Sequence, residues 1–83
     1  MTNAQAVEVL ARNVNAELTR RHWDMTELAR RADLNHNTIY RISNRASRGP
    51  NLYTLCAIAE ALHVEPADLL RDPDRGEADP WTR

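Results

Sequence analysis

Residues 24–45, DMTELARRADLNHNTIYRISNR, decide the fold, because they combine two short helical patterns with a turn between them. Asp24 is a favoured N-cap residue, and Glu27 follows it at the spacing of a capping box. Trp23 before the cap and Leu28 after it have the spacing of a hydrophobic staple. These signals predict that a helix begins at Asp24.

The second half of the stretch predicts a turn and then a second helix. Asp33 falls at the turn, since Asp adopts left-handed backbone more readily than most residues other than glycine. Asn35 is a favoured N-cap residue, and Ile39 and Ile42 then give the helix an apolar side. The other side carries polar residues, namely His36, Asn37, Tyr40, Arg41 and Asn44.

The polar side of this second helix has side chains that recognise the edges of DNA bases. Asn bonds bidentately to adenine, and Arg bonds to the O6 and N7 atoms of guanine. These side chains stand in the first turn and one turn later, where a helix in the major groove meets the bases. A solvated surface would have similar polarity, so the pattern alone leaves both interpretations open.

The arrangement resembles the helix-turn-helix family of phage lambda-type repressors and Cro proteins. The residues that carry the resemblance are Leu28-Ala29, Leu34, Asn35, Ile39 and Ile42, followed by Pro50-Asn51, Leu55, Ile58-Ala59, Ala61-Leu62-His63-Val64 and Leu69-Leu70. The similarity covers roughly residues 4–71. It implies a compact all-α, five-helix, lambda-repressor-like domain that binds double-stranded DNA with the helix at residues 36–45.

Three positions depart from the family pattern. Asp33 stands where the family often has Gly, and Ser43 stands where it often has Glu, so these two concern geometry and stability. Met25 stands where the family often has Gln, a residue that touches DNA phosphate. One phosphate contact is therefore expected to differ from the family.

By position, the resemblance implies two sets of DNA contacts. The residues placed against base edges are His36, Asn37, Tyr40 and Arg41. Those placed near phosphates are Asn35, Asn44, Arg45, Arg48, Arg20 and Arg21. For the last two, favourable charge at a helix C-terminus is an equally good interpretation.

The charge distribution agrees with a DNA partner although the net charge of −1 does not. Residues 20–48 hold seven arginines and three acidic residues, whereas residues 72–83 hold four acidic residues and two arginines. The cationic groups thus gather in the helix-turn-helix stretch, and the acidic end offsets them in the sum.

The remaining chain predicts three further helices and an acidic tail. Residues 2–22 form an amphipathic pattern through Val7, Leu10, Val14 and Leu18, with Thr2 and Gln5 at capping-box spacing. Residues 46–50 are a loop with Gly and Pro. Asn51 and Pro66 have the residue types of helix starts. No segment alternates as a strand would, so we expect one domain at 1–71 and an irregular tail at 72–83.

Composition excludes several classes of protein. Eighty-three residues allow one small core, and a single cysteine forms no disulfide within the chain, which fits a reducing cytoplasm. No apolar run of about 18 residues and no signal-peptide pattern occur, so membrane insertion and export are not expected. His22, His36 and His63 lack metal-ligand spacing, and Cys56 is expected to fill the core. We expect no metal, no cofactor, no small-molecule ligand and no catalytic activity.

The expected function is sequence-specific transcription regulation, most simply repression by a phage or prophage repressor of the immunity or Cro type. An antitoxin that represses its own operon and a helical protein–protein interaction module are the alternatives. A homodimer is expected on DNA, with Leu69, Leu70 and Trp81 as its contact residues. The sequence leaves open whether the chain is a fragment of a longer repressor.

Overall fold

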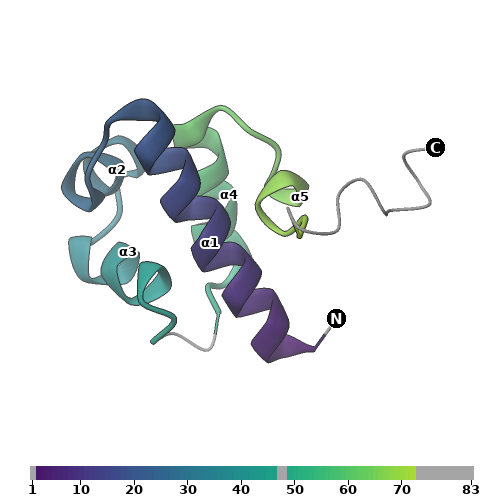
Figure 1. Ribbon diagram of the computed structural model, residues 1–83. Helices are drawn as coiled ribbons and strands as arrows, with labels where there is room; N and C mark the ends of the chain where they lie inside the picture. Colours follow the sequence, from purple (N-terminus) through teal and green to yellow (C-terminus); the bar gives the residue numbers. More distant parts are fainter. Residues whose placement is uncertain (1, 47–48, 73–83) are drawn as a thin grey trace.

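The computed structural model describes residues 2–46 and 49–72, and within these ranges it is all-helical. The helices are α1 (Asn3–Arg21), α2 (Met25–Ala32), α3 (His36–Ser43), α4 (Leu52–Leu62) and α5 (Pro66–Leu69). The described residues contain five helices and no strand, which confirms the expected fold class (Figure 1). The two helices that precede α3 occur where the sequence predicts them. α3 itself ends at Ser43, two residues before the predicted end at residue 45.

Side-chain caps begin the helices where the sequence predicts them. Thr2 and Gln5 form a complete capping box at α1. Asp24 accepts a hydrogen bond of 2.8 Å from the backbone N–H of Glu27, and Asn51 accepts one of 2.8 Å from that of Thr54. These bonds satisfy N–H groups that the first turn of a helix leaves unpaired.

Left-handed residues end three of the helices. His22, Asp33 and His63 have φ values of 59°, 57° and 59° and follow α1, α2 and α4. The backbone after each closes over the last turn, as when Leu34 N–H donates to the Ala29 carbonyl across 2.9 Å. Asp33 therefore has the conformation expected for it, while the two histidines take positions that glycine usually fills.

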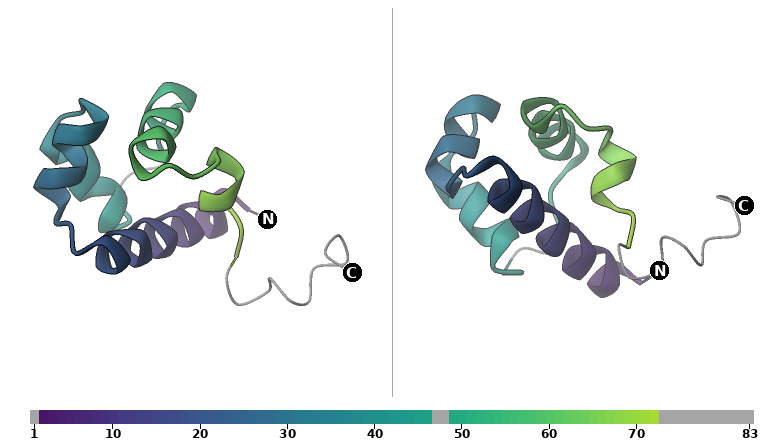
Figure 2. Two further views of the ribbon diagram at one scale, coloured as in Figure 1. Left: turned by 90° about the horizontal axis from the view of Figure 1, so that it is seen from above. Right: turned by 45° about the horizontal axis from the view of Figure 1, so that its top comes forward.

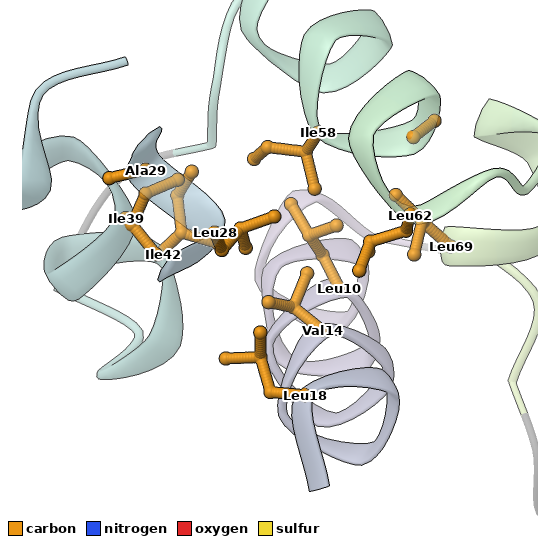
Figure 3. Packing of buried hydrophobic residues seen from close by; sticks show 11 residues of the cluster. Leu10, Val14, Leu18, Leu28, Ala29, Ile39, Ile42, Ile58, Leu62 and Leu69 are labelled. Carbon is orange, nitrogen blue, oxygen red and sulfur yellow. The ribbon is translucent and has the colours of Figure 1, made fainter. Parts of the chain in front are cut away.

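The helices surround one core. In Figure 1, α1 crosses the molecule with α2 and α3 on one side and α5 on the other, and Figure 2 shows α4 on the opposite side of the core from α1. Figure 3 shows the side chains that meet there. The cluster consists of Leu10, Val14, Leu18, Leu28, Ala29, Ile39, Ile42, Ile58, Ala59, Leu62 and Leu69.

Two asparagines of α1 tie it to other helices through polar contacts. The Asn13 side-chain amide donates to the carbonyls of Leu69 and Arg71 across 2.8 and 2.9 Å, which satisfies the end of α5. Asn15 exchanges hydrogen bonds with Ser43 at the last turn of α3. The position of α3 is therefore fixed by its apolar side and by its C-terminal end.

Two expectations about apolar residues were wrong. Cys56 is exposed, because it lies on the side of α4 that turns away from Ile58 and Leu62. Leu69 has only 1% of its surface exposed and belongs to the core, so it has no surface to offer a partner. Leu70 remains 37% exposed, and Trp81 lies outside the described residues.

Candidate nucleic-acid interface

α2, the turn at Asp33 and α3 form a helix-turn-helix held against the core. Leu28, Ala29 and Ala32 of α2 are buried, as are Ile39 and Ile42 of α3. The small alanines allow the two helices to approach closely, and Figure 3 shows Leu28, Ile39 and Ile42 gathered together. With its apolar side fixed in this way, α3 turns its opposite side to solvent.

The exposed side of α3 consists of the residues that the sequence predicts as base-reading. His36, Asn37, Tyr40 and Arg41 are all exposed. The Asn35 side chain caps α3 by accepting a hydrogen bond of 2.7 Å from the Asn37 N–H. This side of the helix carries one cation, donors and acceptors, and no acidic residue, which is the chemistry that base edges require.

Among the described arginines, Arg41 differs in having no ion pair. Carboxylates bind the other described arginines, with Glu17 on Arg20 and Arg21, Glu27 on Arg30 and Arg31, Glu8 on Arg45, Asp68 on Arg71, and Asp72 within 4.0 Å of Arg12. No hydrogen bond or ion pair of Arg41 occurs with any part of the chain that the structure describes. Its guanidinium is therefore available to a ligand without first losing a partner.

The two arginines at the end of α1 have different surroundings. Arg20 pairs with Glu17 at 2.7 Å while 65% of its side chain stays exposed. Arg21 is only 19% exposed and donates to Glu17 and to the carbonyl of Leu62 in α4. Arg21 therefore joins α1 to the C-terminal end of α4, and we leave it out of the candidate contact surface.

The segment after α3 carries the remaining phosphate candidates. Asn44 is exposed at the C-cap of α3, and Arg45 follows with φ 61°. Arg45 pairs with Glu8 of α1 at 2.5 Å, so a phosphate would have to displace this carboxylate. Arg48 lies outside the described residues.

Two arginines of α2 form a cluster with the ring of Trp23, which precedes the helix. The Arg31 guanidinium lies 4.3 Å from the centre of the Trp23 ring, and Arg30 and Arg31 both donate to Glu27. Hydrogen bonds from Arg31 and Arg30 hold the pKa of Glu27 below its ordinary value. Glu27 does not complete the capping box expected with Asp24, since only the Asp24 half of the pair is formed.

Comparison with known families supplies the deciding observation. The family model of the Cro/C1-type HTH DNA-binding domain matches residues 13–75, which is most of the chain. The chain belongs to this family. Membership makes it a DNA-binding transcription regulator whose partner is double-stranded DNA. Comparisons with curated proteins and with solved structures found no match.

The Cro/C1-type domain accommodates each of its three unusual residues in a different way. Met25 begins α2 and packs against the core, so its side chain contributes to the stability of the domain. Asp33 supplies left-handed backbone without glycine. Ser43 is buried and bonded to Asn15, a partner that no spacing in the sequence could reveal, since 28 residues separate the two.

Two kinds of feature are absent from residues 2–46 and 49–72 of this Cro/C1-type domain. No helix there is long and apolar enough to cross a membrane. No group of three or more His, Cys, Asp or Glu side chains there is placed to hold a metal ion.

Proposed function

We propose that this protein is a sequence-specific repressor of the phage or prophage type, which occupies an operator in the bacterial cytoplasm and excludes polymerase from it. The observation that carries the proposal is the exposed side of α3, where Arg41 shares the surface with Asn37 and Tyr40 and has no ion pair with any described residue. In such a complex α3 lies in the major groove, and base-edge contacts by His36, Asn37, Tyr40 and Arg41 specify the operator.

Phosphate contacts set the register of α3 and supply much of the affinity. Asn44 and Arg20 are exposed candidates, and the exposed Asn35 offers its amide nitrogen, because only its oxygen is used by the cap. Arg45 and Arg48, which follow α3 in the sequence, complete the set. The domain that binds DNA is proposed to comprise residues 1–71, with residues 72–83 as a tail that makes no base contact.

The binding unit is proposed to be a homodimer on a two-fold symmetric operator. One α3 covers few base pairs, and two copies would read half-sites spaced about one helical turn, roughly 10 base pairs. Leu70 remains a candidate for the contact between copies because it is exposed beside the buried Leu69, and Trp81 is the second candidate.

Selection of bound duplexes from a random pool tests the proposal. We expect one enriched sequence with two-fold symmetry, bound more tightly than a scrambled duplex at two salt concentrations. Retention that is equal for all duplexes would overturn a sequence-specific role. No retention at low salt would favour the protein–protein interaction module. An enriched but asymmetric site, bound by a monomer in sedimentation, would overturn only the dimer.

A further inference from the structure

A hollow with a volume of about 130 Å³ lies between α3 and the first turn of α4. Its lining residues are Asn37, Thr38, Arg41, Ile42, Pro50 and Thr54. Asn37 and Arg41 also belong to the exposed side of α3. The hollow therefore opens beside the side chains that are proposed to read bases.

The lining changes from polar to apolar with increasing burial. Asn37 and Arg41 are exposed, Thr38, Pro50 and Thr54 are half-buried, and Ile42 is buried. The less exposed lining thus includes Ile42, the proline ring and two threonines, each of which carries a methyl group beside its hydroxyl. A small apolar group gains free energy by leaving water for such a surface, whereas a phosphate would lose hydration there.

We propose that this hollow receives the C5-methyl group of a thymine in the operator, beside the base pair that Arg41 contacts. The inference rests on the proposed function, since it assumes that α3 lies in the major groove. Thymine is the one base that carries a methyl group in that groove, and proteins read it by apolar contact. Thr54 and Pro50 thereby become specificity-determining residues although they lie outside the helix-turn-helix.

The size of the hollow fits this occupant. A water molecule occupies about 30 Å³ in the liquid, so the hollow admits a few groups of that size. The methyl-bearing edge of a pyrimidine lies within that limit. The contact adds one thymine to the bases that helix α3 specifies by hydrogen bonds.

Uracil substitution tests the proposal with the intact protein. Each thymine of the selected operator is replaced in turn by deoxyuridine, which removes one methyl group and no hydrogen-bonding atom. We expect affinity to fall roughly fourfold at one thymine per half-site, the loss for one buried methyl group. A second comparison replaces the same T·A pair by a C·G pair with or without a C5-methyl group on the cytosine. We expect the duplex with 5-methylcytosine to bind more tightly than the duplex with unmethylated cytosine.

The variant Thr54→Leu assigns the effect to the hollow. The larger side chain fills the space, and the backbone N–H that Asn51 caps is retained. We expect the ratio of thymine to uracil affinity to fall to about one. The matched control is Thr19→Leu, an exposed threonine of α1 that does not line the hollow and should keep the ratio.

Three outcomes would overturn the inference. The first outcome concerns the wild-type protein alone and so does not depend on the folding of a variant. If no deoxyuridine weakens its binding, the hollow holds no methyl group. If Thr54→Leu keeps the ratio, the methyl group is read elsewhere. If Thr54→Leu instead removes the effect of one methylphosphonate linkage, the hollow holds a phosphate. Absence of any preferred duplex would overturn the proposed function as well, so the two failures are distinguishable.

Discussion

The Ser43 hydroxyl donates a hydrogen bond of 3.0 Å to Asn15 Oδ1, and the Asn15 amide nitrogen lies 3.3 Å from the Ser43 carbonyl. This exchange joins the last turn of α3 to the middle of α1. Ser43 is the one polar residue among the buried residues that the structure describes. The end of the proposed reading helix is thus fixed by a polar pair inside the domain.

Loss of one member of this pair should destabilise the domain. In Ser43→Ala, the side-chain oxygen Oδ1 of Asn15 loses its hydrogen-bond donor in a partly buried position, which costs about 1–3 kcal/mol. We expect the melting temperature to fall by several degrees, and the double variant with Asn15→Ala to lose less than the sum of the two single variants. Thermal melts of all four proteins measure this coupling. Additive losses would show that the two side chains do not interact.

Substitution of Asp33 by glycine should stabilise the domain. Its φ of 57° costs a side-chain-bearing residue free energy that glycine does not lose. We expect Asp33→Gly to stabilise the domain by about 1 kcal/mol, which raises the melting temperature of so small a domain by roughly 4–8 °C. Asp33→Val should lower it, because a β-branched residue tolerates left-handed backbone poorly. Equal melting temperatures for the two variants would contradict this turn geometry.

Arg41 and Arg48 should behave as two kinds of contact. Arg41→Ala is expected to cost about 1–3 kcal/mol on the selected operator and to relax preference at one base pair, while binding to a scrambled duplex changes much less. Arg48→Ala is expected to weaken all duplexes alike and to reduce the salt dependence by about one ion. Titrations of both variants against both duplexes at two salt concentrations measure the difference. Equal weakening of the two duplexes by Arg41→Ala would remove α3 from base reading.

Acid should destabilise the domain through its arginine-bound carboxylates. Burial raises the pKa of Glu17, but hydrogen bonds from Arg20 and Arg21 outweigh it and hold the pKa below 4.5. A group whose pKa is lower in the folded state stabilises the fold above its unfolded pKa and loses that contribution as the pH falls through its folded pKa. We therefore expect the melting temperature to be steady at neutral pH and to fall below about pH 4.5.

The variant Glu17→Gln checks the assignment of this acid effect. It should melt at a lower temperature than the wild type at neutral pH, and the difference should shrink in acid, where the wild-type carboxylate becomes protonated. Glu60→Gln is the matched control, since Glu60 is exposed on α4. A constant difference at every pH would place the acid effect in other groups.

Local signals carried most of what could be predicted. Asp24, Asn35 and Asn51 accept hydrogen bonds from the backbone of their own first turns, and Asp33 takes the left-handed conformation of its own turn. Each of these features depends on residues two to four positions away, so the sequence displays both partners. The apolar stripes also depend only on helical periodicity, which predicts the buried Leu10, Val14 and Leu18 of α1, although Val7 of the same stripe is only half-buried.

Residues brought together from distant segments could not be predicted in this way. Cys56 was expected in the core but is exposed, because the broad apolar side of α4 meets α2 and α5 over only part of its width. Leu69 and Leu70 are equal in sequence, yet one is buried and the other is exposed, because a short helix has only one side against the core. A helix of four residues is too short for its apolar periodicity to show which of the two leucines is buried.

The sequence by itself determined the helix starts, the turn at Asp33 and the polar side of α3, because caps, backbone preference and periodicity act within a few residues. Only the tertiary structure decided which arginines remain available for DNA. Glu8 reaches Arg45 across 37 residues, and the Leu62 carbonyl reaches Arg21 across 41. Such pairs form when the core brings α1 beside the end of α3 and the end of α4, so spacing along the chain holds no record of them.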